Sequence, residues 1–234
     1  MQGKSEKYIQ QFDQFIKTID KEIIKSINSK NNKLTKQISG IYRRLWENYK
    51  EINGTSAGLY GISEYIVFST FKIFIEKLNK PQKFISRKIN KDLRYFELKK
   101  NNKGLIIYRA ASLKHFPIHL KLNRAPDIAI LKKEGGKFKF VTVIEIKNYL
   151  DKGNINSAID ILSQIREAVK DSYTKYVIFS FGRISVKNGE TQKRLMGFQE
   201  NENNFLITNE AGNEKFKVID LSKFLNIIKN KIVL

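Results

Sequence analysis

Two segments of alternating apolar and polar residues flank a glycine pair at residues 135–136. The first begins DIAIL at Asp127, the second reads FVTVIEIK and ends at Lys147, and both are rich in β-branched residues. This two-residue repeat predicts β-strands, and the short glycine-containing loop predicts that they form a hairpin. If the loop comprises residues 135–137, Asp127 lies directly opposite Glu145. A loop of another length breaks this register unless a β-bulge restores it.

Apolar residues at helical spacing predict helices in both halves of the chain. We expect helices over residues 4–27, 34–50, 59–78 and 155–170, and a closing helix from Leu221. Strands are expected over 93–98, 104–110 and 176–181, with one or two more near 205–208 and 216–219. The segment YVIFSF within this set is a continuous apolar run, typical of a central strand buried on both faces. The order of elements predicts an α/β fold with an N-terminal helical hairpin that packs on the core or on a partner subunit.

The chain is strongly basic, since 44 Lys and Arg residues against 23 Asp and Glu residues give a formal net charge of +21. Such a charge favours polyanions, of which nucleic acid is the commonest inside cells. A membrane surface is the competing partner, but no basic amphipathic segment stands apart from the predicted fold. The absence of cysteine excludes disulfides, thiolate zinc sites and cysteine nucleophiles. Without a long apolar run or an apolar leader, we expect a cytoplasmic protein, or one inside a host cell if it is viral.

Three charged side chains converge at one end of the predicted hairpin. In a strand, Glu145 and Lys147 point to the same face and Ile146 to the other, and Asp127 faces Glu145 from the neighbouring strand. Mg²⁺ or Mn²⁺ prefers oxygen ligands, so Asp127, Glu145 and the carbonyl of Ile146 are the candidate metal ligands. Lys147 could then position a water or stabilise charge on a phosphate. The alternative is an ion pair at a strand end that has no function.

Pro126-Asp127 followed by Glu145-Ile146-Lys147 resembles the PD-(D/E)XK nuclease superfamily, which includes many restriction endonucleases and Holliday-junction resolvases. The resemblance implies a restriction endonuclease-like core of helix, three antiparallel strands, helix and strand, with a central mixed β-sheet flanked by helices. It also implies metal-dependent phosphodiester hydrolysis, with Asp127 and Glu145 as metal ligands and Lys147 as the catalytic lysine. The segment Glu97-Leu98-Lys99 has the same spacing but lacks a preceding strand that begins with Asp.

Two further residues are candidates for the site. Glu64 lies within the apolar helix predicted over 59–78, where a carboxylate needs a partner. In the resembling superfamily the first core helix often supplies an acidic metal ligand, so Glu64 is our candidate. The alternative is a glutamate favoured by the helix dipole alone. Gln164 occupies the helix in which some members use a glutamine, but its position off the apolar stripe indicates a solvated side chain.

A basic run precedes the predicted catalytic strands. Residues 77–103 contain ten basic and two acidic residues, interleaved with aromatic ones. Lys83, Arg87 and Lys88 in this run, and Arg124 beyond it, are predicted to contact DNA phosphates. A solvated lysine-rich surface is the alternative. Farther along the chain, His115 and His119 flank a proline and are interpreted as structural.

We therefore expect a helical extension over 1–52, a nuclease core over 53–185 and a strand and helix addition over 186–234. The predicted function is a Mg²⁺- or Mn²⁺-dependent DNA endonuclease, with a slight preference for structure-selective cutting as in junction resolvases. A sequence-specific restriction endonuclease and a non-catalytic DNA-binding protein are the alternatives, and RNA is also open as a substrate. A homodimer is expected, because cutting both strands of a duplex or junction requires two sites.

Overall fold

The computed structural model describes residues 2–29, 33–53, 60–88, 94–109, 125–186, 189–209 and 216–234. The helices are α1 (Gln2–Asn28), α2 (Leu34–Asn53), α3 (Tyr60–Leu78), α4 (Lys152–Val169), α5 (Glu190–Glu200) and α6 (Leu221–Ile232). The strands are β1 (Ile85–Lys88), β2 (Arg94–Lys100), β3 (Lys103–Arg109), β4 (Ile128–Glu134), β5 (Lys137–Lys147), β6 (Lys175–Ser180) and β7 (Asn204–Thr208). Helices and strands intermix along the chain, which is an α/β arrangement.

A seven-stranded mixed sheet contains these strands in the order of the sequence. Strands β1 to β5 form an antiparallel meander, whereas β6 and β7 continue the sheet parallel to β5. The parallel pairs require crossovers, which α4 and α5 supply. As a result, Lys88, Arg109, Lys147 and Ser180, the last residues of β1, β3, β5 and β6, lie at one edge of the sheet. We call it the carboxyl edge, and β4 begins there.

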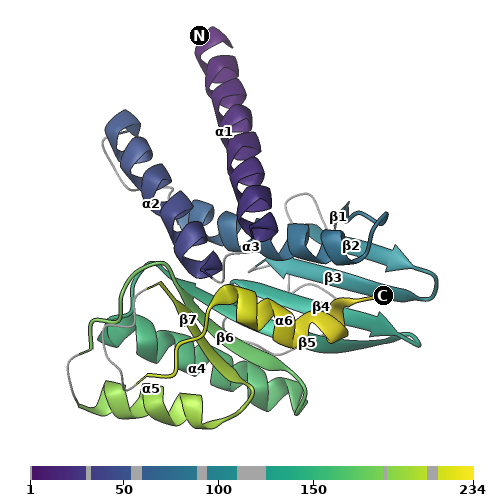
Figure 1. Ribbon diagram of the computed structural model, residues 1–234, viewed down its shortest axis with the longest axis vertical. Helices are drawn as coiled ribbons and strands as arrows, with labels where there is room; N and C mark the ends of the chain where they lie inside the picture. The colour runs from purple at the N-terminus through teal and green to yellow at the C-terminus, as the bar shows by residue number, and fades with distance from the viewer. Residues whose placement is uncertain are drawn as a thin grey trace.

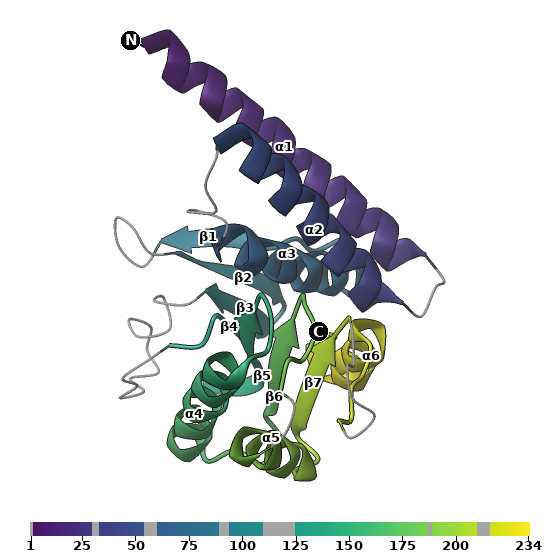
Figure 2. The same cartoon turned by 90° about the vertical axis from the view of Figure 1, so that its left-hand side faces the viewer.

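Helices cover both faces of the sheet, with α1, α2, α3 and α6 on one face and α4 and α5 on the other (Figures 1 and 2). Alternation along the strands supplies both cores. In β3, Leu105 and Ile107 belong to the core under α3 and α6, whereas Ile106 and Tyr108 belong to the core under α4 and α5. No described helix is both long enough and apolar enough to span a membrane.

The predicted helices and central strands are confirmed, and the sequence-based prediction misses two elements. β1 was not predicted, because its residues are all exposed and carry no apolar repeat. α5 was not predicted either, because three of its five buried residues are the polar Thr191, Gln192 and Gln199, which interrupt the apolar repeat. Of the one or two strands expected near 205–208 and 216–219, the first is β7, whereas residues 216–219 make only an isolated bridge between Val218 and Leu206.

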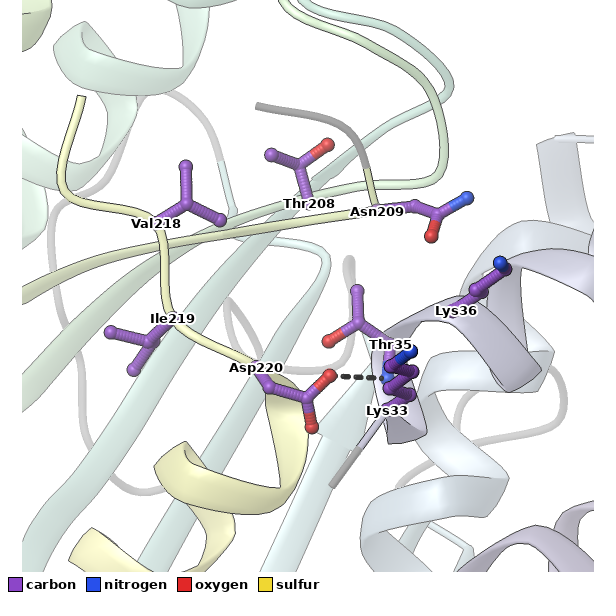
Figure 3. A pocket seen from close by; sticks show the side chains of 8 residues that line it. All are labelled: Lys33, Thr35, Lys36, Thr208, Asn209, Val218, Ile219 and Asp220. Carbon is purple, nitrogen blue, oxygen red and sulfur yellow. Dashed lines mark hydrogen bonds between the residues drawn. The ribbon is translucent and has the colours of Figure 1, made fainter. Parts of the chain in front are cut away.

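Asp220 joins the N-terminal helical hairpin to the rest of the fold. Its carboxylate caps α6 by accepting from the Ser222 N–H at 2.8 Å, and it also accepts from the N–H groups of Leu34 and Thr35 at the start of α2. Thr35 reciprocates, because its hydroxyl accepts from the Leu221 N–H at 2.7 Å. These hydrogen bonds lower the pKa of Asp220 although burial alone would raise it. The joint lines a pocket of about 280 Å³ (Figure 3).

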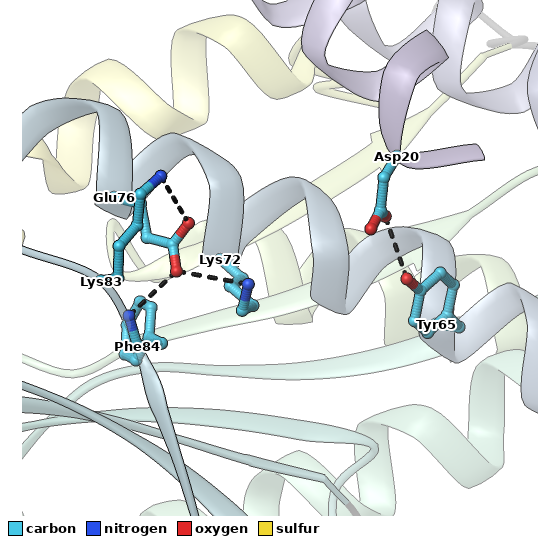
Figure 4. A network of polar contacts seen from close by, with 6 residues as sticks. All are labelled: Asp20, Tyr65, Lys72, Glu76, Lys83 and Phe84. Atoms are coloured by element: carbon cyan, nitrogen blue, oxygen red, sulfur yellow. Dashed lines mark hydrogen bonds and ion pairs between the residues drawn. The ribbon is translucent and has the colours of Figure 1, made fainter. Parts of the chain in front are cut away.

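The buried carboxylate of Glu76 fixes the turn between α3 and β1. Glu76 accepts from the Phe84 N–H at 2.9 Å and pairs with Lys72 at 3.2 Å and Lys83 at 3.5 Å (Figure 4). The same figure shows Asp20 of α1 accepting from the Tyr65 hydroxyl of α3 at 3.0 Å. These contacts hold α3 against both the basic run and the N-terminal hairpin.

Candidate active site

The β4–β5 hairpin brings Asp127 and Glu145 together, by a route that differs from the predicted one. The turn contains only Gly135 and Gly136, both with positive φ, and Glu134 pairs with Lys137. This loop is one residue shorter than predicted, which by itself would put the carboxylates out of register. A bulge in β5 opposite Ile130 and Leu131 restores the register, so that Ile128 pairs with Ile144. Continued by one residue, the pairing places Asp127 opposite Glu145.

Close contacts tie the two carboxylates to the end of β5. Asp127 Oδ2 accepts from the Ile146 N–H at 2.6 Å, which fixes the chain entering β4 against the chain leaving β5. Glu145 Oε1 accepts from Lys147 Nζ at 2.6 Å. Glu145 is only 3% exposed, and its Oε2 has no hydrogen-bond partner among the described residues. A buried carboxylate oxygen without a donor is costly, so it is a candidate ligand for a cation.

The pKa values of Asp127 and Glu145 also indicate a cation-binding site. Burial, then the charge of Glu145, raises the pKa of Asp127 from 3.8 to about 7, against the opposing hydrogen bond from Ile146. Burial also raises the pKa of Glu145, although Lys147 opposes the shift. Two adjacent carboxyl groups that resist ionisation need additional positive charge when both are ionised. Strongly perturbed carboxyl groups of this kind are also concentrated at functional sites.

Glu64 lies near Asp127 and Glu145 and belongs to α3, which covers the face of the sheet opposite α4. Its negative charge contributes to the raised pKa of both Asp127 and Glu145. Its own Oε2 accepts from Arg109 Nη2 at 3.2 Å, and Arg109 is the last residue of β3. The partner that Glu64 requires within an apolar helix is therefore an arginine.

The residues fit a hard divalent cation in part. In the portion of the chain that the structure describes, no three acidic or histidine side chains are grouped closely enough to hold a metal ion. Mg²⁺ commonly uses one or two carboxylates and completes its shell with waters and substrate phosphate. Asp127 and the unpaired oxygen of Glu145 can provide the carboxylates, and the carbonyl of Ile146, the residue between Glu145 and Lys147, is a possible third ligand. Glu64 could join only by releasing Arg109.

Comparison with known proteins assigns no family to the chain. No family model matches it, and no curated protein matches it. The candidate site consequently depends on the local chemistry at the carboxyl edge.

A second Glu-x-Lys segment provides an internal comparison. Glu97 in β2 is buried and pairs with Lys99 at 3.3 Å, much as Glu145 pairs with Lys147. Its other oxygen pairs with Arg87 at 3.3 Å, so both oxygens of Glu97 have a cation. The residue opposite Glu97 in β3 is Ile106 rather than an aspartate. The surroundings of Glu97 are those of a satisfied ion pair, whereas those of Glu145 leave an oxygen bare.

The predicted DNA-binding residues fall into separate groups. Lys83 and Arg87 pair with Glu76 and Glu97, respectively, so part of their charge is used within the fold. Lys88 is exposed at the carboxyl edge. Arg124 lies outside the described residues, as do the two predicted structural histidines. Gln164 is exposed on α4, as expected for a solvated side chain.

The strand register places basic residues in a row along the carboxyl edge. Lys88 pairs with Arg94, and the pairing of Tyr95 with Tyr108 puts the next residue of β3, Arg109, beside Arg94. Arg109 in turn pairs with Ile128, immediately after Asp127. At about 4.8 Å between strands, the three basic residues extend about 10 Å from β1 to β3, and Asp127 precedes the first residue of the next strand, β4. Sequence reasoning missed Arg109, although a basic residue that ends an apolar strand was a signal for it.

Proposed function

We propose that the protein is a metal-dependent endonuclease with a restriction endonuclease-like core that hydrolyses phosphodiester bonds in DNA. The observation that carries the proposal is the buried Glu145 carboxylate, which has one bare oxygen and faces Asp127 beside Lys147. The order of α3, the meander to β5, α4 and β6 agrees with the order that the resemblance implies. A net charge of +21 favours a polyanionic substrate.

Each residue of the candidate site has a separate role in the proposed reaction. Asp127 and Glu145 would hold Mg²⁺ or Mn²⁺, and the bound ion would supply an activated water and stabilise charge on the phosphate. The Ile146 N–H holds Asp127 in place, so the carboxylate is positioned before a cation arrives. Lys147, whose Nζ lies 2.6 Å from Glu145, would orient the attacking water by hydrogen bonding.

The row of basic residues favours a substrate strand that crosses the ends of β1, β2 and β3 before it reaches the carboxylates. Such contacts recognise the backbone and carry no base sequence. We therefore favour structure-selective cutting over sequence-specific restriction, with a homodimer placing two sites on one substrate.

A second function, DNA binding without hydrolysis, is favoured by the ion pairs already present. Lys147 holds Glu145 and Arg109 holds Glu64, so two of the three carboxylates are neutralised without a metal. The two functions differ in one outcome, which is whether the divalent cation supports cleavage or only alters binding.

The decisive experiment is a cleavage assay on plasmid, single-stranded and four-way-junction DNA and on RNA, with and without Mg²⁺ or Mn²⁺. We expect Asp127→Ala and Glu145→Gln to abolish cleavage while preserving or tightening DNA binding. The matched control is Glu97→Gln, which alters the other buried glutamate of a Glu-x-Lys segment and should retain cleavage. Undiminished cleavage by the Glu145→Gln variant would refute the proposed site.

A further inference from the structure

Arg109 is held by few contacts for a half-buried arginine at a candidate active site. Its Nη2 donates to Glu64 at 3.2 Å, and its guanidinium carbon lies 5.9 Å from the centre of the Phe68 ring. Its Nε is buried and has no hydrogen-bond partner within the described part of the chain. The planar guanidinium presents several N–H donors in a fork that matches phosphate oxygens. One side of the group is therefore paired, while further donors remain for a ligand.

The charge balance around Arg109 indicates a ligand with one negative charge. Asp127, Glu145 and Glu64 carry three negative charges when ionised, against two positive charges on Lys147 and Arg109. The cluster is then one charge negative, and a divalent cation makes it one charge positive. A phosphodiester, which carries one negative charge, brings the complete assembly to neutrality. A neutral ligand would leave the assembly one charge positive. Any singly charged anion restores the balance, and a phosphodiester is the anion that the proposed function provides and that the fork of the guanidinium matches.

We propose that Arg109 binds a phosphate of the substrate backbone, and that Glu64 holds the guanidinium in place until the substrate arrives. The inference rests on the proposed function, because that function provides the phosphodiester. Phe68 supports the flat face of the group, and the pairing of Arg109 with Ile128 fixes its backbone beside Asp127. Arg109 is thus the last member of the basic row and the one nearest to the carboxylates.

The test measures binding of a ligand with one phosphate, so that the rest of the basic surface contributes little. The probes are thymidylyl-thymidine and its uncharged methylphosphonate analogue, titrated by NMR in Mg²⁺ against the full-length protein. Arg109→Gln should weaken binding of the charged probe roughly tenfold or more and leave the neutral probe unchanged. Arg109→Lys should recover part of the preference, because it keeps the charge without the fork.

Arg194→Gln is the matched control. Arg194 is as exposed as Arg109, each side chain being 37% exposed, and it pairs with Asp160 at 2.5 Å on the far helical layer. This variant should bind both probes as the wild type does. Thermal unfolding of each variant in the same buffer identifies a loss of fold. If Arg109→Gln does not fold, binding of the two probes is compared between the wild type and Arg109→Lys instead.

The outcomes separate this inference from the proposed function. Equal weakening of both probes by Arg109→Gln, or no weakening of either, overturns the phosphate-binding role even if the wild type cleaves DNA. A wild type without any preference for the charged probe also overturns it. A charged-probe preference that depends on Arg109 supports the role even if no nucleic acid is cleaved, in which case hydrolysis is the proposal that fails.

Discussion

Replacing Asp127 with Asn is expected to stabilise the metal-free protein. The folded state raises the pKa of Asp127 from 3.8 to about 7, so folding opposes ionisation of this carboxyl group. Below pH 3.8 the group is protonated in both the folded and unfolded states, and there is no cost. The cost grows as the pH rises from about 4 to 7 and is complete above pH 7, where both states are ionised. The difference of about three pKa units corresponds to about 4 kcal/mol at about 1.36 kcal/mol per unit.

Asparagine removes the charge and keeps the local contacts. Its amide oxygen can still accept from the Ile146 N–H, and its amide nitrogen can donate to the bare oxygen of Glu145. At pH 8 we expect the free energy of unfolding to rise by about 2–4 kcal/mol, because some of the gain is lost in burying the amide. For a chain of this length that is a rise in Tm of about 5–10 °C. Near pH 4 the variant and the wild type should have nearly the same stability.

The assay is thermal and urea unfolding in a metal-free buffer at pH 4, 6 and 8. Asp220→Asn is the matched control, since it makes the same chemical change at an aspartate whose pKa is lowered by its contacts with two helix starts. It should destabilise the protein at pH 8 by about 1 kcal/mol, the opposite sign. If Asp127→Asn is as destabilising as Asp220→Asn, the reasoning about the raised pKa is wrong.

Four shorter predictions concern metal, salt, backbone and assembly. Mg²⁺ should raise the Tm of the wild type but not of Asp127→Asn, and its affinity should fall from pH 8 to pH 6, because Asp127 must lose its proton. DNA affinity should fall about tenfold or more between about 50 and 200 mM salt, and Lys88→Gln should flatten that slope, as binding assays would show. Gly182→Ala should lower both Tm and cleavage, because a Cβ there would lie 2.7 Å from the Asn148 carbonyl oxygen and would displace the chain that follows Lys147. Gly197→Ala in α5 is the control: its Cβ would meet nothing within 4 Å, so it should be neutral or stabilising. Light scattering should give a mass above the 27.3 kDa of one chain, and a monomer that only nicks would contradict the paired arrangement.

The pairing of Asp127 with Glu145 could be predicted because local rules govern most of it. Alternation fixes which residues share a face, and a glycine pair fixes the position of the turn. The length of the loop was wrong by one residue, and the bulge in β5 corrected the error. A bulge depends on how the two strands twist and pack, and the sequence around Val141 has no feature that distinguishes it.

Ion pairs between residues far apart in the chain could not be predicted from the sequence. Glu64 and Arg109 are 45 residues apart and meet only because α3 crosses the end of β3. Lys83 and Arg87 have the composition of phosphate contacts, yet their pairing with Glu76 and Glu97 depends on how the turn after α3 and the edge of the sheet pack. A run of basic residues reports the total charge of a surface, but not which of its charges are already used.

The two Glu-x-Lys segments show what separates a site from a structural ion pair. Within each strand the arrangement is nearly the same, since a buried glutamate forms an ion pair with the lysine two residues later. The neighbouring strands make the difference, because Arg87 satisfies the second oxygen of Glu97 and Asp127 adds a second negative charge beside Glu145. For stability alone, the surroundings of Glu97 are the better solution. The surroundings of Glu145 lower the stability of the folded chain above pH 7, and a bound cation is the addition that would reverse this.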